Sequence, residues 1–190
     1  HLSIRRQRQM CIRDSMQSAW QADLFKFAVH RRVGVAYGEK RKRQAVISND
    51  AEFIIINYDG IEIVAEDIAR NNFDLIIIDE ANAYKTPTTK RWKTLNRLIT
   101  PNTWLWMMTG TPAAQSPTDA YGLAKMCVPE KVDRFFGSFR DRVMVNVSKF
   151  RWLPRPDADK IVYESLQPAI RFTKEECLDL PEITHVFRDA

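Results

Sequence analysis

The stretch Leu75-Ile76-Ile77-Ile78-Asp79-Glu80 decides the fold of this chain. Its apolar residues follow one another without alternation, which is typical of a strand covered on both faces of a sheet. Two adjacent carboxylates end the strand. Ligands of parallel α/β sheets bind at the carboxyl ends of the strands, so the sequence places Asp79 and Glu80 where a ligand would bind.

Other apolar runs predict further strands, over residues 33–37, 53–57 and 104–109, with the central strand over 75–79. Helical spacing of apolar residues lies between and beside these runs, at Trp20, Leu24 and Phe27, at Ile61, Val64 and Ile68, and at Trp92, Leu95 and Leu98. Strands that alternate with helices indicate an α/β fold with a mainly parallel sheet and helices on both faces.

The C-terminal part of the chain does not continue this alternation of strands and helices. Ser116-Pro117-Thr118-Asp119 resembles a capping box with proline at the first helical position, which predicts a further helix. Prolines interrupt the chain from Pro154 onward. We therefore expect one lobe over residues 16–150 and a connector over residues 151–190.

Residues 1–15 are basic and of unusual sequence. Met10-Cys11-Ile12-Arg13-Asp14-Ser15 resembles the translation of a transposase end used in sequencing libraries. We expect residues 1–15 to be non-native or disordered and to take no part in the fold.

Composition places few limits on function. The 190 residues, 45% hydrophobic and 28% charged, suit one globular α/β domain, and no apolar run approaches the length of about 20 residues that a membrane span needs. Cys11, Cys127 and Cys177 are far apart and odd in number, which favours a reducing, cytoplasmic setting over a disulfide framework or a zinc site. Residues 1–15 carry much of the net charge of +5, so the charge is weak evidence for nucleic-acid binding.

The carboxylate pair suits nucleotide hydrolysis. This chemistry needs a hard oxygen ligand for Mg²⁺ and a group that orients or deprotonates the attacking water. Asp79 suits the first role, and Glu80 suits the second as a general base. The alternative is a strand that ends in solvated acids. Thr109-Gly110-Thr111-Pro112 ends the strand after it, where glycine and hydroxyl groups could approach phosphate, although an ordinary turn is the alternative.

Two segments resemble motifs II and III of superfamily-two helicases, in the same order along the chain: Asp79-Glu80-Ala81-Asn82 and Thr109-Gly110-Thr111-Pro112. Residues 16–184 continue the resemblance to Swi/Snf-type translocases. The matching segments are residues 18–24 (SAWQADL) with Lys26-Phe27, residues 37–41 (YGEKR), residues 56–59 (INYD), Gln167-Pro168, Arg171, Thr173-Lys174 and Leu180-Pro181.

The resemblance implies part of a RecA-like P-loop NTPase lobe, with ATP and Mg²⁺ as cofactors. Asp79 would bind Mg²⁺ and Glu80 would activate water. The residues that would bind ATP or couple it to nucleic acid are Asn82, Thr109, Gly110 and Thr111. Asn82 stands where the family commonly has histidine, and Gln115 where it often has asparagine.

Nucleic-acid contacts are expected in the loops after the strands, at Asn57, Tyr58, Lys85 and Thr86, with double-stranded DNA as the partner and RNA as the other possibility. The basic run Lys40-Arg41-Lys42-Arg43 reads by default as a solvated helix face. Trp92, Trp104 and Trp106 read as core residues.

The printed sequence contains no GxxxxGK[ST] loop before Trp20, and the second RecA-like lobe with its arginine finger is also missing. We therefore expect a fragment of an ATP-dependent DNA helicase or translocase, inactive alone, from a bacterial or virus-infected host cytoplasm. One alternative is a non-catalytic nucleic-acid-binding or interaction module with a degenerate helicase fold. A P-loop ATPase that acts on proteins is a further alternative.

Overall fold

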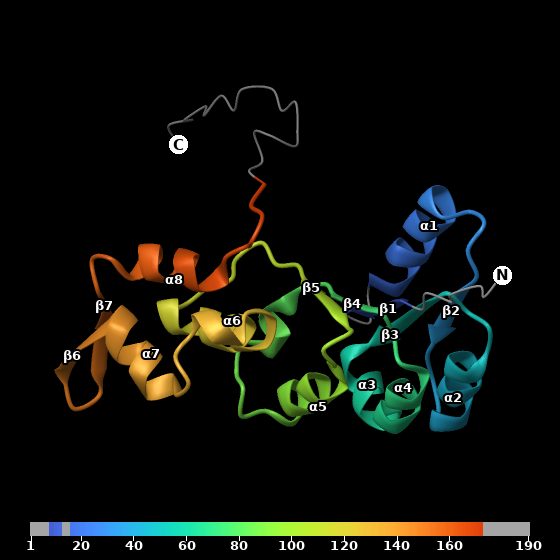
Figure 1. Ribbon diagram of the computed structural model, residues 1–190, viewed down its shortest axis with the longest axis horizontal. Helices are drawn as coiled ribbons and strands as arrows, with labels where there is room; N and C mark the ends of the chain where they lie inside the picture. Colours follow the sequence, from blue (N-terminus) through green and yellow to red (C-terminus); the bar gives the residue numbers. More distant parts are fainter. Residues whose placement is uncertain (1–7, 13–15, 173–190) are drawn as a thin grey trace, which may run out of the picture.

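Five parallel strands form the main sheet of the computed structural model, which describes residues 8–12 and 16–172 (Figure 1). The sheet order is β2-β3-β1-β4-β5, and every neighbouring pair is parallel. The strands are β1 (Arg8–Ile12), β2 (Val33–Ala36), β3 (Phe53–Asn57), β4 (Leu75–Ile78) and β5 (Trp104–Met107). All of β3 and the last three residues of β4 are buried, as their unbroken apolar sequence predicts.

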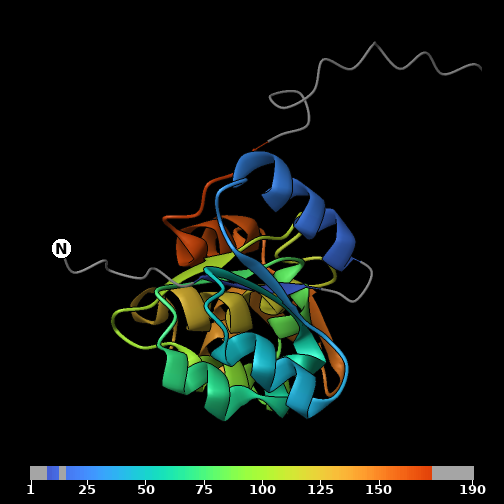
Figure 2. The ribbon, with the colours of Figure 1, turned by 90° about the vertical axis from the view of Figure 1, so that its right-hand side faces the viewer.

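Helices cover both faces of the sheet, which confirms the predicted layered α/β architecture (Figure 2). Helix α1 (Gln17–Phe27) lies on one face. Four helices lie on the other: α2 (Lys40–Ser48), α3 (Tyr58–Ile63), α4 (Ala65–Asn71) and α5 (Lys90–Leu98). None of the helices in the described part of the chain is long and apolar enough to cross a membrane.

A second, smaller group of elements follows β5 along the chain. It consists of α6 (Ala120–Cys127), α7 (Phe136–Val143), the antiparallel hairpin of β6 (Met144–Ser148) and β7 (Arg151–Pro154), and α8 (Ala158–Leu166). Short 3-10 turns lie at Ala81–Tyr84 (η2), Pro117–Asp119 (η3) and Pro129–Lys131 (η4). Ser116 caps η3 by accepting a hydrogen bond from the Thr118 amide at 3.3 Å, and α6 follows directly.

Residues 151–166 correct the expectation of a connector. They form β7 and α8, and Ala158 and Val162 of α8 share a buried cluster with Phe139 and Val143 of α7. The prolines lie between these elements, where they end one and precede the next, so they do not prevent packing. Residues 173–190 of the expected connector lie outside the described residues.

Residues 8–12 correct the expectation that residues 1–15 take no part in the fold. They form β1, which pairs with β3 on one side and β4 on the other. Ladder hydrogen bonds join backbone groups that every residue carries, so an unusual sequence can still complete a sheet. That residues 1–15 are non-native stays a prediction.

Two tryptophans of β5 correct a further expectation. Trp104 is 73% exposed and Trp106 is 55% exposed, whereas the intervening Leu105 packs against the main core. β5 pairs only with β4 among the described strands, and α1 packs over β2 and β3. The face of β5 that carries the two tryptophans is therefore open, and a strand pattern alone does not show which face is covered.

Gly122 lies at a close approach between the two groups of elements. A Cβ atom at this position of α6 would overlap the Lys85 carbonyl group of the turn after β4. The carbonyl of Gly122 also accepts a hydrogen bond from Trp92 Nε1 of α5 at 2.9 Å. Only glycine lets the backbones of α6 and η2 come this close.

We predict that Gly122→Ala lowers the free energy of unfolding by about 1–3 kcal/mol, because the methyl group forces α6 away from η2. Chemical denaturation measures the change. Gly137→Ala is the matched control, since Gly137 also lies in a helix but a Cβ there meets nothing within 4 Å. The control should be neutral or more stable by up to about 1 kcal/mol. Equal effects of the two substitutions would contradict this packing.

Candidate functional site

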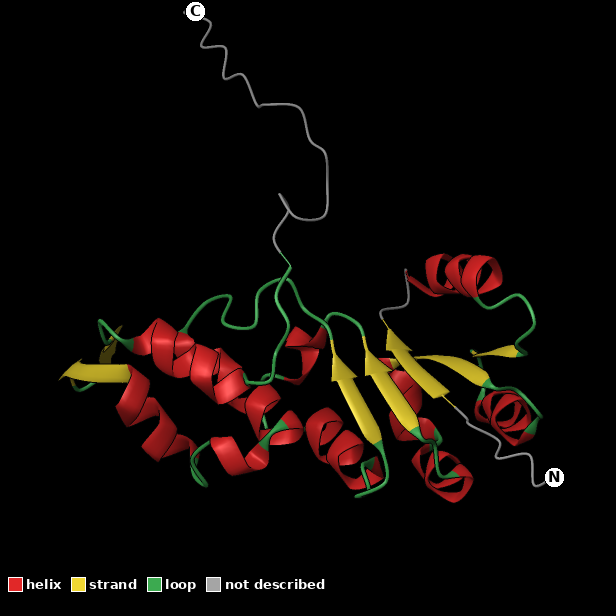
Figure 3. Cartoon of the chain, turned by 45° about the horizontal axis from the view of Figure 1, so that its top comes forward, coloured by secondary structure: helices red, strands yellow, loops and turns green. Residues whose placement is uncertain are grey.

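The loops after β4 and β5 are joined by backbone hydrogen bonds. The Met108 amide donates to the Ile78 carbonyl at 2.8 Å, and the Ala81 amide donates to the Met108 carbonyl at 2.8 Å. These bonds continue the pairing of β4 and β5 beyond the ends of the strands. Figure 3 shows the strands of the main sheet as yellow arrows that lie side by side. The predicted site residues of both loops consequently lie at one edge of the sheet: Asp79, Glu80, Asn82, Thr109, Gly110 and Thr111.

Both carboxylate oxygens of Asp79 accept a hydrogen bond. Oδ1 accepts from the Glu80 amide at 2.9 Å, and Oδ2 accepts from Trp20 Nε1 of α1 at 2.9 Å. The carboxylate is half-buried and its orientation is set from two sides. Sequence reasoning placed Trp20 in a helical stripe and in the matching segment 18–24, but it did not predict this contact, because an indole 59 positions away shows no local sign of it.

Glu80 has a left-handed backbone conformation, with φ 50° and ψ 53°. A residue with a Cβ pays for this conformation, so another gain must hold it in place. Tyr58 supplies a support: its hydroxyl donates to the backbone carbonyls of Asp79 and of Glu80, the latter at 3.3 Å. Among the described residues, the Glu80 carboxylate has no hydrogen-bond or ion-pair partner, and it is half-buried.

Asn57 and Tyr58 are buried, so their predicted contact with nucleic acid stays a prediction that would need a rearrangement of these side chains. The Asn57 Oδ1 atom accepts a hydrogen bond from the Arg43 guanidinium at 2.7 Å. Arg43 also donates to the carbonyls of Ala36 and Gly38, each at 2.7 Å. A buried guanidinium needs such partners, and here it ties α2 to the ends of β2 and β3.

The charge run Lys40-Arg41-Lys42-Arg43 is therefore solvated only in part. Lys40, Arg41 and Lys42 are exposed, as expected, and Arg43 is buried. Sequence reasoning missed Arg43 because its partners come from separate elements. A run of four cations does not show which one points inward.

Asn82 connects the two loops through its side chain. Its Nδ2 donates to Thr111 Oγ1 at 3.4 Å, and the Thr111 amide donates to Thr109 Oγ1 at 3.3 Å. The Asn82 Oδ1 atom is buried and has no hydrogen-bond partner among the described residues. A buried acceptor without a donor is costly, which makes this oxygen a point where a ligand or water donor would be bound.

Lys85 and Thr86 follow on the same loop. Lys85 Nζ donates to Gln115 Oε1 at 3.1 Å and forms an ion pair with Asp119 at 3.2 Å, which holds the segment after Thr111 against η2. Its side chain remains about one third exposed. Thr86 is exposed. Of the residues expected to contact nucleic acid, these two are therefore accessible.

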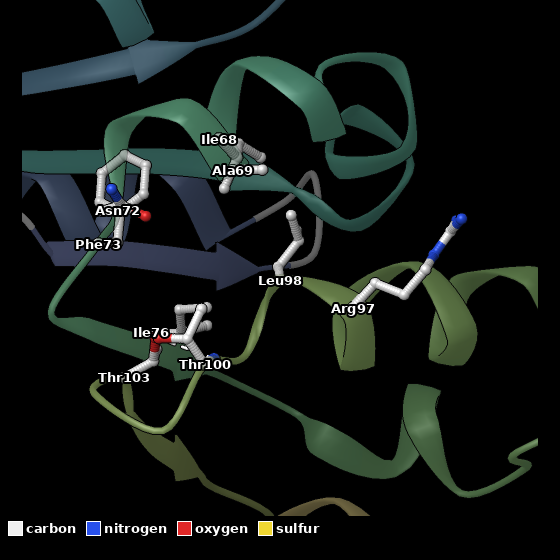
Figure 4. Close-up of a pocket in the computed structure, with 9 residues that line it drawn as sticks. All are labelled: Ile68, Ala69, Asn72, Phe73, Ile76, Arg97, Leu98, Thr100 and Thr103. Atoms are coloured by element: carbon white, nitrogen blue, oxygen red, sulfur yellow. Dashed lines mark hydrogen bonds between the residues drawn. The ribbon is translucent and has the colours of Figure 1, made fainter.

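A small cavity lies away from this edge. It has a volume of about 40 Å³ and is lined by residues at the other end of β4, among them Phe73, Ile76 and Thr103 (Figure 4). Ligand pockets are about 300–1,000 Å³. This cavity holds little more than water and is a packing gap.

The site residues fit Mg²⁺. This ion takes one or two carboxylates and completes its shell with water and phosphate oxygens, and Asp79 with Glu80 supplies that number of carboxylates. No cluster of three or more potential metal-binding side chains occurs in the described part of the chain. For ATP, the chain offers only this acidic half of a site, since the printed sequence has no GxxxxGK[ST] loop to hold the phosphates.

Comparison with known proteins agrees with this geometry. A family model, the SNF2-related domain, matches residues 11–172. Among solved structures, the Sulfolobus solfataricus SWI2/SNF2 ATPase core in complex with dsDNA is similar, with a TM-score of 0.56 and 23% sequence identity. The match covers 73% of this chain and 28% of that one, so this chain spans well under half of it. No curated protein matches. The solved structure shows that the fold is part of a RecA-like core.

We predict that Glu80→Gly is more stable than Glu80→Ala by about 1 kcal/mol, because glycine adopts the left-handed conformation without a Cβ penalty. Urea denaturation of the two variants measures the difference. The same pair at Glu66, an exposed position in α4, is the control and should give the opposite order, since alanine favours a helix over glycine by about 1 kcal/mol. The same order at both positions would contradict a strained Glu80.

Proposed function

This chain belongs to the SNF2-related domain family. From that premise, we propose that it is the part of an ATP-driven DNA motor that binds Mg²⁺ and positions the attacking water. The observation that carries the proposal is the joined edge of β4 and β5. There, an oriented carboxylate, a carboxylate with no partner among the described residues, and a hydroxyl-bearing turn meet. The parent protein would couple ATP hydrolysis to movement.

In this proposal Asp79 holds Mg²⁺ and Glu80 acts on water. Bound Mg²⁺ would neutralise charge on the phosphoryl oxygens during transfer. The Trp20 indole and the Glu80 amide keep the Asp79 carboxylate in one orientation, so it loses less conformational entropy when it binds an ion. The free Glu80 carboxylate can accept a proton from the attacking water, which is the general-base role.

The contact between Asn82 and Thr111 supports coupling between the two loops. Asn82 belongs to the loop with the acids, and Thr111 belongs to the loop after β5. A movement of either loop changes the length of this 3.4 Å hydrogen bond. Asn82, Thr109, Gly110 and Thr111 are thus our proposed ATP-sensing and coupling residues, and an amide takes the place of the more common imidazole.

The open face of β5 supports the proposal that the phosphate-binding half belongs to the same parent protein. Trp104 and Trp106 expose large apolar areas on β5, the strand that leads to the turn at Thr109. Exposed apolar surface of this kind marks a place where another segment packs. A strand and helix with a glycine-rich loop, placed there, would bring phosphate-binding amides next to Thr109. The second lobe would complete the motor.

Double-stranded DNA is the proposed partner. The solved relative is a SWI2/SNF2 ATPase core in complex with dsDNA, and the accessible Lys85 and Thr86 lie in the loop that leads from the acids. A phosphate group would compete with Asp119 for the Lys85 ammonium group. We also propose a cytoplasmic setting for the parent, in line with its scattered cysteines.

A non-catalytic nucleic-acid-binding module is the second candidate. The absence of a GxxxxGK[ST] loop from the printed sequence favours it. The two candidates predict different sequences upstream of Met16: the motor requires a GxxxxGK[ST] loop there, and the binding module does not. Recovery of the gene from its original sample, without transposase-made libraries, decides whether the upstream reading frame encodes the loop.

We predict that the purified 190-residue chain does not hydrolyse ATP, because it lacks a phosphate cradle, and that the parent protein does so with stimulation by duplex DNA. In the parent, Glu80→Gln should lower kcat by about 10²–10⁴-fold. Steady-state phosphate release measures both. Glu164→Gln, a substitution of an exposed glutamate on α8, is the control.

Two results would count against the motor. Activity of the 190-residue chain that is lost in Asp79→Ala would show that no further phosphate loop is needed. A parent without a GK[ST] loop and without ATP turnover would leave the binding module as the function.

A separate prediction concerns DNA contact at Lys85. Lys85→Ala should lower the slope of the logarithm of duplex affinity against the logarithm of salt concentration by about 0.9, since one fewer phosphate is neutralised. Fluorescence anisotropy with a labelled duplex measures the slope. An unchanged slope would remove Lys85 from the interface and leave it as a partner of Asp119 alone.

A further inference from the structure

The hairpin of β6 and β7 projects at the end of the molecule opposite β2 (Figure 1). Its tip is Lys149-Phe150-Arg151. These residues took no part in the functional reading of the sequence, and they lie outside the candidate site at the ends of β4 and β5. Their chemistry indicates that they bind a separate ligand.

Positive charge is concentrated around this hairpin. Residues 140–155 contain five arginines and lysines and one aspartate, a net charge of +4, against +5 for the whole chain. Some of these cations have structural partners: Arg140 pairs with Asp141 at 3.0 Å and Arg142 with Asp133 at 2.8 Å. Lys149 and Arg151 have no ion-pair partner among the described residues, and both are exposed.

Phe150 lies between these two cations and is 88% exposed. The Lys149 Nζ atom lies 5.6 Å from the centre of its ring. A phenylalanine at the tip of a hairpin adds nothing to the core of the protein. A single exposed apolar residue is common, but one between two unpaired cations is suited to a ligand that is both anionic and partly apolar.

The hairpin is held firmly to the rest of the chain. The Arg140 guanidinium carbon of α7 lies 3.9 Å from the centre of the Trp152 ring of β7. Arg155 Nε, just beyond β7, donates to the carbonyls of Asp141 at 3.0 Å and Met144 at 3.2 Å. Met144, the first residue of β6, is buried. The tip is therefore presented by a supported ribbon, which lowers the entropy lost on binding.

We propose that Lys149, Phe150 and Arg151 form a second contact with duplex DNA, separate from the candidate ATP site. Lys149 and Arg151 bind phosphates on the two sides of a groove, and Phe150 packs against sugars and base edges between them. Phosphate contacts fix the position of a protein on DNA, and apolar side chains can enter the minor groove between base steps. The inference rests on the proposed function, because it concerns the same DNA track.

Charge decides between DNA and a protein partner. The outer face of the hairpin also carries Val145, Val147 and Leu153, which are about half exposed and could pack against another protein. The two unpaired cations lie at the tip, where a polyanion would neutralise both. A duplex is continuous, so a contact far from the ATP site can lie on the same DNA molecule.

The test is a salt titration of duplex binding by the 190-residue chain. Lys149→Ala/Arg151→Ala should lower the slope of log affinity against log salt by about 1.8, which corresponds to two phosphates. Phe150→Ala should weaken binding by about ten-fold at constant slope, because it removes no charge. Lys160→Ala, a change of an exposed lysine on α8, is the control and should leave both quantities unchanged. Thermal denaturation confirms that the variants fold.

Three results would overturn the proposal, and they separate it from the proposed function. If the wild-type chain binds duplex DNA and the double variant has the same slope, the hairpin is not a contact but the DNA-binding function stands. If the wild-type chain binds no duplex, both fail. If Phe150→Ala abolishes self-association in sedimentation but leaves DNA affinity unchanged, the partner of the hairpin is a second copy of the chain.

Discussion

The hydrogen bonds that continue the β4–β5 pairing beyond the two strands are the interaction on which the site depends. Through the Met108 amide and carbonyl, they place the turn at Thr109 next to the acids at Asp79 and Glu80. Backbone bonds of this kind have little freedom, so the two loops have one relative position. The side-chain contact of Asn82 with Thr111 then adds a link that depends on side-chain identity.

Buried polar groups beneath the site hold it in a costly geometry. Glu80 keeps a left-handed backbone, and the Tyr58 hydroxyl binds the carbonyls on both sides of that strained residue. Arg43 and Asn57 are buried as well, and they join α2 to the ends of β2 and β3. These groups would be expensive to bury singly, and they are stable because each satisfies another. Tyr58, one of the residues that the sequence suggested for DNA contact, thus supports the backbone of the acids.

The two faces of the main sheet differ in how completely they are covered. Helices α2 to α5 cover one side of the sheet, whereas β5 exposes two tryptophans on the other. Parallel sheets are ordinarily covered on both faces, so two exposed tryptophans in β5 are unusual for an α/β domain. The hairpin at the far end differs in kind: its exposed phenylalanine lies between cations, which suits a polyanion better than a hydrophobic partner.

Sequence alone predicted the strands of the main sheet other than β1, and it placed two carboxylates at the end of β4. The unbroken apolar runs predicted β3 with its observed bounds and β4 to within one residue, because burial on both faces is a local property of a strand. The sequence also predicted that Asp79, Glu80 and Thr109 share one edge of the sheet, because the carboxyl ends of parallel strands meet there. Tertiary structure alone decided which polar side chains point inward. The bond from Trp20 to Asp79, the burial of Arg43 and the exposure of Trp104 all depend on partners far away in the chain. Periodicity describes a segment and its own two faces, and only packing shows what lies against each face.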